Sequence, residues 1–414
     1  MIVRSEKRSH AEFHSTILGK YMVNQFSCHT GKPRISIIAH RAYGPLARMD
    51  TGHIGGVERQ TSLMARWFAR HGYKVSMITW DEGQPDGLTI EGVRVFKMCR
   101  ENTGIKGLRF FCPKWTSLCQ TLKRADADVY YYNSGGGVLG QIVMWCRRHS
   151  RKSIFSVAAN RVCDATHMSS APLRERLLYR YGLRNAHSII VQTQLQQQML
   201  HEGFGVDSTV IPMPCEGFST DLNSSAKSIT VKGARVLWVG RISEEKRFEW
   251  LLDVAERCPQ FTFDVVGASN NDSSYARAQM ERAGKIPNVK LHGRLLHAEL
   301  AEFYKRCRVL CCTSEYEGFP NTFLEAWSCG IPVVSTFNPD GIIAKYGLGW
   351  TASSIDKIVD GLKTALGSPE KWRTASHAVR SYYLENHTMD ATMPKFEKLF
   401  SDIIADRDSG SDCT

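Results

Sequence analysis

The 414-residue chain has no apolar run that approaches the roughly 20 residues of a membrane-spanning helix. Residues 1–34 also lack the apolar core of a signal peptide. The 13 cysteines are scattered and odd in number, and the nearest cluster, Cys307, Cys311 and Cys312, lacks the Cys-x2-Cys spacing of a zinc site. These absences argue against a membrane-embedded, secreted or zinc-binding protein and predict free thiols in a reducing cytosol.

Signals for other metals and for nucleic acid are missing too. The close carboxylate pair Asp126 and Asp128 stands at the start of a predicted strand, and we interpret it as structural, so no metal ligand is assigned. No zinc finger, recognition-helix pattern or aromatic-basic interleaving accompanies the net charge of +12. We therefore expect neither a metal nor a nucleic-acid partner.

The positive charge concentrates between residues 147 and 184, where the acidic residues are Asp164 and Glu175. A basic face of this kind can hold a protein against anionic lipid headgroups, each Lys or Arg contributing about 1 kcal/mol. It also fits an ordinary solvated face. The residues assigned to a membrane-facing patch are Arg147, Arg148, Arg151, Lys152, Arg174, Arg176, Arg180 and Arg184.

Apolar strand-like runs alternate with helical patterns in two successive cycles, which predicts an α/β fold with two doubly wound parallel sheets. A composition of 43% apolar residues is sufficient to build both cores. In the first cycle, residues 41–54 are expected as a loop and residues 56–71 as a helix. The first set of strands is expected at 34–40, 74–79, 93–97, 128–133, 153–158, 188–192 and 208–211, and the second at 235–240, 261–266, 289–292, 309–313 and 332–335.

The most informative motif is Glu317-Gly-Phe-Pro-Asn-Thr-Phe-Leu-Glu325. It follows the predicted strand 309–313, forms a turn, and opens a helix over 321–329 that ends before Gly330. Ligands of open α/β sheets bind at the carboxyl ends of strands, where helix N-termini attract phosphate. The two carboxylates can then accept hydrogen bonds from hydroxyls at the two ends of an elongated nucleotide sugar, although the spacing alone also fits two solvated carboxylates.

A second segment has the same strand, basic loop and helix order. The strand that ends at Gly240 is followed by Arg241 and Lys246, and then by an amphipathic helix over 248–257. Arginine offers a rigid fork of donors and lysine a mobile point charge, which together suit a pyrophosphate leaving group. As isolated residues they could equally be solvated loop charges.

Together, Val-Gly-Arg-Ile-Ser-x2-Lys and Glu-Gly-Phe-Pro-Asn-x3-Glu-Ala-x3-Gly-x-Pro-Val-Val-Ser resemble the retaining glycosyltransferases of family 4, with roughly residues 34–400 covered. The resemblance implies the GT-B fold, in which two Rossmann-like domains face each other across a cleft. It also implies a last helix that crosses back to the first domain. The expected boundaries are an extension at 1–32, an acceptor domain at 33–214 with a linker at 212–232, a donor domain at 215–380, a crossing helix at 381–405 and a disordered tail at 406–414.

The resemblance also implies roles for individual residues. Arg241, Lys246 and Glu317 are expected to be catalytic, the two cations by stabilising leaving-group charge and Glu317 by holding the transferred sugar. Glu325 is expected on the ribose hydroxyls. The residues expected to bind the donor are Gly240, Arg241, Lys246, Gly318, Phe319, Asn321, Thr322 and Glu325, with Gly55 and Gly56 of the first domain allowing close approach of a phosphate or acceptor.

Three positions depart from the family pattern. Asn160 stands where many members carry a histidine near the reacting sugar, so a titrating group is missing there unless Asp164 or His167 folds back. Pro320 replaces a frequent glycine and removes one backbone donor. Residues 267–269 read Gly-Ala-Ser where a Gly-x-Gly turn is usual.

The sequence therefore predicts a retaining, metal-independent hexosyltransferase that takes a UDP- or GDP-sugar and a glycan or lipid-linked glycan acceptor, in bacterial surface polysaccharide or exopolysaccharide synthesis. No cofactor beyond the donor is expected. The expected location is the cytoplasm, with the option of a peripheral position on the inner face of the membrane. Two alternatives stay open: a nucleotide-sugar-metabolising enzyme of epimerase type, and a GT-B-like subunit that has lost catalysis because of Asn160.

Overall fold

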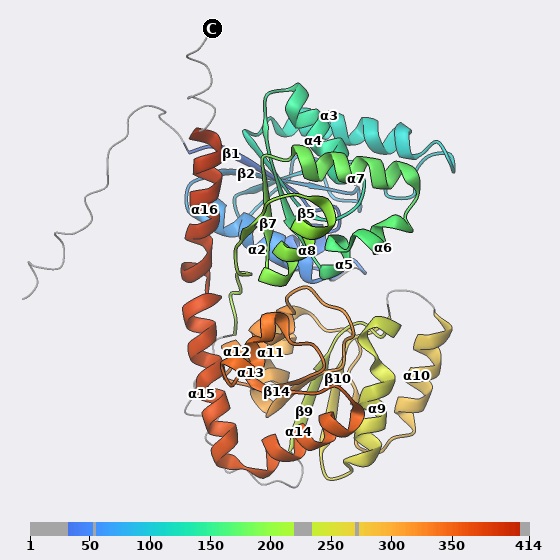
Figure 1. Cartoon of the computed structure of the whole chain (residues 1–414). Coiled ribbons are helices and arrows are strands. Elements are labelled where there is room, and N and C mark those ends of the chain that lie inside the picture. The colour runs from blue at the N-terminus through green and yellow to red at the C-terminus, as the bar shows by residue number, and fades with distance from the viewer. Residues whose placement is uncertain (1–31, 53–54, 219–233, 270–272, 406–414) are drawn as a thin grey trace, which may run out of the picture. The chain divides into compact units, whose positions relative to one another are not determined.

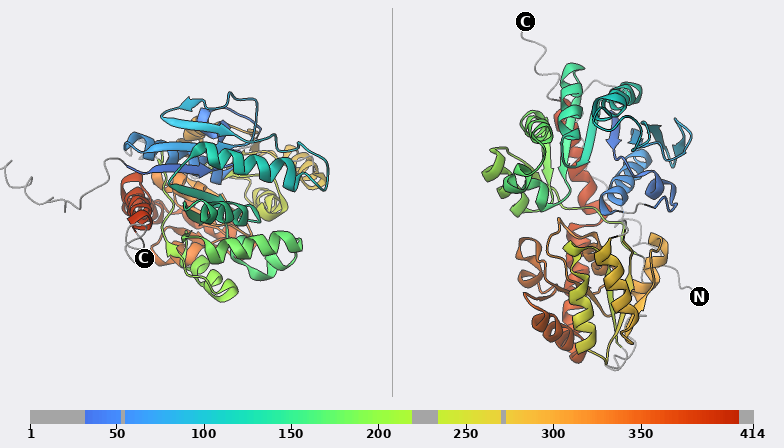
Figure 2. Two further views of the ribbon diagram at one scale, coloured as in Figure 1. Left: turned by 90° about the horizontal axis from the view of Figure 1, so that it is seen from above. Right: turned by 90° about the vertical axis from the view of Figure 1, so that its right-hand side faces the viewer.

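The computed structural model describes residues 32–52, 55–218, 234–269 and 273–405 (Figures 1 and 2). The expectations for the extension at 1–31, for most of the linker and for the tail at 406–414 lie outside these residues. The unit that contains both sheets begins at Pro33.

The first sheet has eight strands in the order β3-β4-β2-β1-β5-β6-β7-β8, all parallel except the edge strand β3. The interior strands are apolar and buried on both faces, as expected for a parallel sheet that helices cover on both sides. Their bounds are β1 Arg34–Ile38, β2 Lys74–Thr79, β3 Thr89–Ile90, β4 Val93–Lys97, β5 Val129–Ser134, β6 Lys152–Val157, β7 Ser188–Val191 and β8 Thr209–Val210.

Two helical layers enclose this sheet (Figure 1). One core contains apolar side chains of α3 (Thr116–Ala125), α4 (Val138–Arg148), α7 (Leu173–Asn185) and α8 (Gln194–Phe204). The core on the other face contains side chains of α2 (Gly56–Arg70) and of the C-terminal helix α16 (Met389–Ala405). Short helices occupy the loops: α1 (Tyr43–Ala47), η1 (Phe110–Trp115), α5 (Asn160–Cys163) and α6 (Ala165–Ser169).

The second sheet has six parallel strands in the order β11-β10-β9-β12-β13-β14. Its strands are β9 Arg235–Val239, β10 Thr262–Val266, β11 Val289–Leu291, β12 Val309–Cys312, β13 Val333–Ser335 and β14 Gly349–Thr351. One core is built with α9 (Phe248–Arg257), α10 (Ser274–Gly284) and α14 (Ile355–Gly367). The other is built with α11 (His297–Arg306), α12 (Asn321–Ser328), α13 (Ile342–Lys345) and α15 (Pro369–Asn386), and the 3-10 turns are η3 (Glu244–Lys246) and η4 (Pro339–Gly341).

Both sheets have the Rossmann strand order, with a point where the direction of winding reverses. In the first sheet this point lies between β1 and β5, and in the second between β9 and β12. Ligands of such sheets bind beyond the carboxyl ends of the strands at the switch point. The Arg241–Lys246 and Glu317–Glu325 segments follow β9 and β12, so the fold brings both predicted motifs to this position.

The α/β class and the two Rossmann-like domains agree with the sequence-based expectation. Two short edge strands, β3 and β14, were not expected, and α1 lies inside the segment expected as a loop. The C-terminal prediction was wrong in one respect, because residues 381–405 are not one helix. The helix that contains Ser381 begins at Pro369, ends at Asn386, and is followed by a separate helix, α16.

The break between α15 and α16 coincides with tertiary contacts to the segment that links the two sheets. His387 has φ −130° and ψ −5°, outside the helical region, and its buried ring lies 2.9 Å from the Met213 carbonyl oxygen. The hydroxyl of Tyr383 donates to the Cys215 carbonyl at 2.9 Å, and the Cys215 N–H donates to the His387 carbonyl at 2.8 Å. The chain therefore passes from the first sheet to the second, and back again, at one bonded junction.

Candidate functional site

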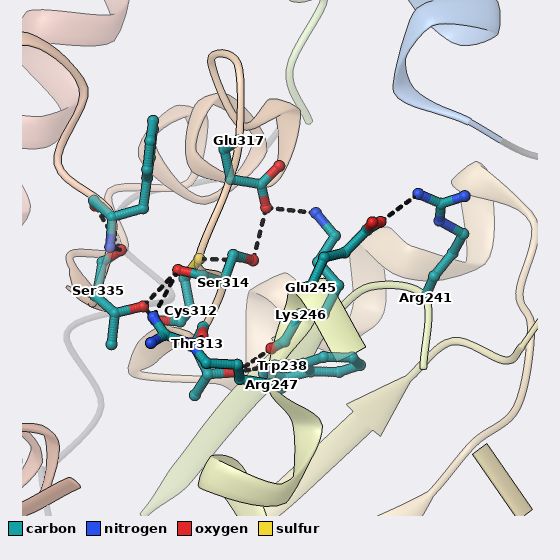
Figure 3. A network of polar contacts seen from close by, with 12 residues as sticks. Trp238, Arg241, Glu245, Lys246, Arg247, Cys312, Thr313, Ser314, Glu317 and Ser335 are labelled. Atoms are coloured by element: carbon teal, nitrogen blue, oxygen red, sulfur yellow. Dashed lines mark hydrogen bonds and ion pairs between the residues drawn. The ribbon is translucent and has the colours of Figure 1, made fainter. Parts of the chain in front are cut away.

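The loops after β9 and β12 are joined by a polar network (Figure 3). The hydroxyl of Thr313 donates to the Lys246 carbonyl at 2.6 Å and accepts from the Trp238 indole N–H at 3.1 Å. Arg247, at φ 46° in the left-handed region, donates from Nε to the Thr313 carbonyl at 2.8 Å and from Nη2 to the Ser314 carbonyl at 3.1 Å. These bonds fix the position from which Lys246 extends.

Lys246 and Glu317 form the central ion pair of this network. Lys246 Nζ lies 2.5 Å from Glu317 Oε1, and the Ser314 hydroxyl donates to the same oxygen at 2.7 Å. The two side chains are only 19% and 16% exposed. Attraction between these charges is stronger here than it would be in bulk water, because little solvent screens it.

Glu325 lies one helical turn inside α12, and its side chain is 1% exposed. The Tyr304 hydroxyl donates to its Oε2 at 2.8 Å, and Arg59 Nη2, from α2 of the first domain, lies 2.6 Å from its Oε1. His297 Nε2 lies 3.7 Å from the same oxygen. Burial, with the nearby Arg59 charge, lowers the pKa of His297 to about 4, so this imidazole is neutral at pH 7.

The N-terminal ends of α2 and α12 meet at the network. A Cβ placed on Gly56 would lie 2.5 Å from Asn321 Nδ2, so a larger residue here would displace the Asn321 side chain. Gly55 and Pro320 are the N-cap residues, and neither supplies a side-chain cap. Two helix ends with uncapped N–H groups give a region of positive potential that suits a phosphate.

The turn at residues 318–319 packs against the first domain. A Cβ on Gly318 would lie 2.4 Å from the Ala158 carbonyl oxygen, and the Phe319 N–H donates to Gln192 Oε1 at 2.9 Å. The Asn160 N–H donates to the Glu317 carbonyl at 3.4 Å. Backbone geometry, and not side-chain chemistry alone, therefore places Glu317.

A further contact between the domains lies beside this turn. The carboxylate of Asp340 accepts from the N–H groups of Gln194 at 2.8 Å and Leu195 at 3.0 Å. These groups are at the N-terminus of α8, so the second domain supplies an anion to a helix end of the first. Asp340 has φ 48°, an uncommon conformation for a residue other than glycine.

Comparison with known proteins identifies the type of molecule to which this site belongs. Residues 55–214 match the model of the glycosyl transferase 4-like domain, and residues 233–368 match that of the glycosyl transferases group 1. The two ranges together cover more than half of the chain. The chain belongs to the family 4 glycosyltransferases.

Curated relatives agree with this assignment, and solved structures agree with the fold. The glycosyltransferase is 25% identical over 255 residues to the GtfA subunit of UDP-N-acetylglucosamine–peptide N-acetylglucosaminyltransferase of Streptococcus pneumoniae; the match covers 55% of this chain and 48%, about half, of that relative. It is 23% identical over 294 residues to the amylovoran biosynthesis glycosyltransferase AmsD of Erwinia amylovora. The match covers 68% of this chain and 77% of AmsD. Its fold matches that of Anabaena HepE in complex with UDP and glucose, with a TM-score of 0.69 and 17% identity. The match covers 89% of this chain and 100% of HepE.

The structure brings most of the predicted site residues of the glycosyltransferase together, but not all. Lys246 and Glu317 are in contact, and Gly56 lies against Asn321. Arg241 lies apart from that pair and binds Glu245 at 2.6 Å, with its side chain 52% exposed. The N–H of Phe319, expected as a donor for the nucleotide sugar, is engaged by Gln192. Gly240, Gly318, Thr322 and Gly55 occupy the expected loops and helix ends around the network.

Sequence reasoning missed three residues of the site. Arg59 and Tyr304 contact the carboxylate of Glu325, and Gln192 accepts from the N–H of Phe319 in the turn. Arg59 follows three residues after the predicted site residue Gly56, so its position gave a usable signal. Tyr304 and Gln192 come from segments remote from both motifs, and only the tertiary fold brings them in.

The structure also shows the contacts of Asn160, which departs from the family pattern, and of its possible substitutes Asp164 and His167. Asn160 Oδ1 accepts from Gln196 Nε2 at 3.0 Å. His167 accepts from Arg161 at 2.7 Å, and Asp164 caps α6 through Thr166, so both side chains are engaged within their own loop. Asp126 and Asp128 pair with Arg34 and Arg151. Among the described residues no group of three His, Cys, Asp or Glu side chains is arranged to hold a metal, and no helix there is long and apolar enough to cross a bilayer.

Proposed function

We propose that this glycosyltransferase moves a hexose, with retention of anomeric configuration and without a metal, from a UDP- or GDP-sugar to a glycan or lipid-linked glycan acceptor in surface polysaccharide synthesis. The observation that carries the proposal is the shielded Lys246–Glu317 pair at the switch point of the second sheet, beside two uncapped helix N-termini. The names of the relatives, one acting with UDP-N-acetylglucosamine and one in amylovoran synthesis, support the donor class and the pathway.

In the proposed mechanism the donor phosphate itself assists the acceptor hydroxyl, and the protein positions the reactants. Lys246 turns from Glu317 to the diphosphate and stabilises the charge that develops on the leaving group. Glu317 is then available to accept hydrogen bonds from hydroxyls of the transferred sugar. Arg241, which is more than half exposed and held by one carboxylate, can reach the same diphosphate from the solvent side.

The ribose hydroxyls bind Glu325 in this proposal. The Tyr304 hydroxyl donates to one oxygen of the carboxylate. Arg59 pairs with the other oxygen, to which the ribose hydroxyls are expected to donate. Ribose binding therefore requires Arg59 to move from Glu325. The N–H groups of Asn321 and Thr322, at the start of α12, are left to face the diphosphate.

The first test is a thermal-shift panel of UDP, GDP and their sugar derivatives, because a ligand that binds only the folded state raises the melting temperature. We expect one nucleotide class to stabilise the wild type. Glu325→Gln should lose most of that shift, and Glu302→Gln on the exposed face of α11 should keep it, each compared with its own ligand-free melting temperature. If no nucleotide stabilises the wild type, the alternative of a subunit without catalysis replaces the proposal.

Retention is tested separately from binding. The product formed with the stabilising donor is analysed by NMR for the coupling constant of its new anomeric proton. We expect the configuration of the donor. An inverted product would reject the mechanism but leave the donor class intact, whereas turnover of the donor sugar without any acceptor would favour the epimerase-type alternative.

A further inference from the structure

Large apolar side chains of the first domain gather in solvent, outside the polar network of the donor site. Five of them are each more than half exposed: Ile105, Leu108, Phe111, Leu173 and Leu177. The first three belong to the segment that leads into α3, and the other two are four residues apart on α7, hence on one face of that helix. Soluble proteins rarely expose such a group unless the patch contacts a partner.

The two segments lie side by side. The guanidinium of Arg174, next to Leu173 on α7, lies 3.6 Å from the centre of the Phe110 ring in η1. The N–H of Phe111 donates to the Leu108 carbonyl at 2.9 Å, and that of Arg109 to the Ile105 carbonyl at 2.8 Å, so tight turns hold the apolar residues of this segment. Figure 1 shows the N-terminal end of α7 close to the segment that enters α3.

Basic side chains alternate with these apolar residues. The η1–α7 surface, as we name it, consists of Ile105, Leu108, Phe111, Leu173 and Leu177 together with Lys106, Arg109, Arg174, Arg176 and Arg180. Glu175 is the acidic residue among them; its carboxylate accepts from the Gly137 N–H at 2.8 Å and lies 3.4 Å from Arg174 Nη2, so it offsets one of these positive charges. The surface is therefore apolar and positively charged at once.

We propose that the η1–α7 surface docks the protein on an anionic lipid bilayer. Aliphatic and aromatic side chains can enter the boundary between headgroups and acyl chains, while neighbouring Lys and Arg side chains stay at the level of the lipid phosphates. A nucleic acid would match the charge, but it offers no apolar layer for isoleucine and leucine. A second copy of the chain would match the apolar residues but would bring the same positive charges together.

The η1–α7 surface lies at the same edge of the first sheet as the donor-site network. The segment into α3 follows β4, and α7 follows β6, so both begin at the carboxyl edge of the first sheet. Gly56 and the donor-site network lie at the same edge. Docking here would place a membrane-held acceptor beside the site. The basic residues Arg151 and Lys152, which precede and begin β6 at the opposite edge of the sheet, are not part of this surface.

The inference goes beyond the proposed reaction and is tested without it. Full-length protein is sedimented with phosphatidylcholine vesicles that contain or lack phosphatidylglycerol. We expect the wild type to bind only the anionic vesicles and to be released by high salt. The double variant Leu173→Ser, Leu177→Ser should bind at least about tenfold more weakly, while the matched control Leu384→Ser, an exposed leucine on α15, should bind like the wild type.

A second variant separates charge from apolar insertion. Arg176→Gln with Arg180→Gln should weaken binding to anionic vesicles, and adding salt should weaken it little further, since fewer lipid charges are engaged. Equal binding of the leucine double variant and the wild type, or no binding of the wild type to either vesicle, would overturn the proposal. So would a wild-type dimer in sedimentation velocity that the leucine double variant abolishes, because the surface would then be an interface between copies.

Discussion

Lys246 obtains its counter-charge in this structure from Glu317, the residue expected to hold the transferred sugar. If Lys246 stabilises the departing diphosphate, Lys246→Gln removes a positive charge that is most needed in the transition state. We expect kcat for nucleotide release from the donor to fall about 10²- to 10³-fold, the usual cost of one such donor. Steady-state kinetics on the folded variant measures it, and a wild-type kcat would remove Lys246 from the mechanism. Lys285→Gln, at an exposed lysine of similar pairing, serves as the control.

Arg59 gives a second prediction about single residues. Arg59→Met leaves the carboxylate of Glu325 without a cationic partner in the ligand-free protein, which raises the free energy of that state relative to the nucleoside complex. We expect the nucleoside that stabilises the wild type to bind about tenfold more tightly, a change of about 1.4 kcal/mol. Isothermal titration calorimetry with the nucleoside measures it. Arg70→Met on the same helix, which removes an exposed pair with Glu91, should change nothing.

The opposite outcome for Arg59 has an equally clear meaning. Weaker nucleoside binding in Arg59→Met would show that the guanidinium holds the nucleoside directly, and that it does not compete with the ribose for Glu325. The diphosphate form tests this further. If Arg59 moves to the phosphates after it leaves Glu325, the nucleoside diphosphate should lose the gain in affinity that the nucleoside shows.

Residues of this kind also mark the limit of sequence reasoning. Lys246 and Glu317 could be chosen because each stands in a motif that follows a strand. Arg59 could not be paired with Glu325, since 266 positions separate them in the numbering and nothing in either segment indicates the other. Long-range pairs depend on domain placement, which local patterns do not encode.

At the scale of elements, the turn after β10 shows why the first residue of the Gly-Ala-Ser segment at 267–269 is a glycine. Gly267 has φ +147°, and a Cβ there would lie 1.8 Å from the Gly240 carbonyl oxygen. The N–H of Gly240 donates to the Val266 carbonyl at 3.1 Å, so the loops after β9 and β10 are in direct backbone contact. The chain reads Gly-Ala-Ser here, and the structure requires only the first of these residues to lack a side chain.

Gly267→Ala should therefore push the loop after β9, which carries Arg241 and Lys246, away from the loop after β10. We expect the free energy of unfolding to fall by about 2 kcal/mol, in the range for overpacking, measured by urea unfolding. Gly284→Ala is the matched control, because a Cβ at this last residue of α10 meets open space and should be neutral or slightly stabilising. Equal stability of the two variants would contradict the close contact.

Elements differ in how well their sequences predict them. Strand β12 lies within the predicted range 309–313, because all four of its residues are buried and burial on both faces demands continuous apolar residues. The edge strands β3 and β14 are two and three residues long and have no such run. The end of α15 was missed because it depends on a tertiary contact of the buried His387 ring with the Met213 carbonyl.

At the scale of the whole molecule, buried histidines make stability depend on pH. Burial lowers the pKa of His40, His297 and His387 to about 4. The unfolded chain, with an ordinary pKa near 6.5, binds more protons than the folded chain between about pH 6.5 and 4, so stability falls as the pH is lowered through this window. It is largest above pH 6.5, where the histidines are neutral in both states.

His387 allows this expectation to be tested at one fully buried position. Between pH 7.5 and 5.5 its shift contributes a loss of about 1 kcal/mol of unfolding free energy. His387→Gln keeps a donor for the Met213 carbonyl but cannot titrate, so its thermal midpoint should fall less over this pH range than that of the wild type. His71→Gln, at an exposed histidine on the first domain, should follow the wild type. Parallel curves for all three proteins would contradict the prediction.

The helix α16 is the last part of the chain that the structure describes, yet Met393, Phe396, Phe400 and Ile403 fill the core of the first sheet. A fragment that ends at residue 214 would therefore leave a groove beside α2 lined with Phe68 and Tyr131, the rings that Phe400 contacts. Such a fragment should be insoluble when expressed alone and should recover when a separate peptide of residues 389–405 is supplied. The same property makes the chain suited to a split reporter, in which the two pieces assemble only when both are present.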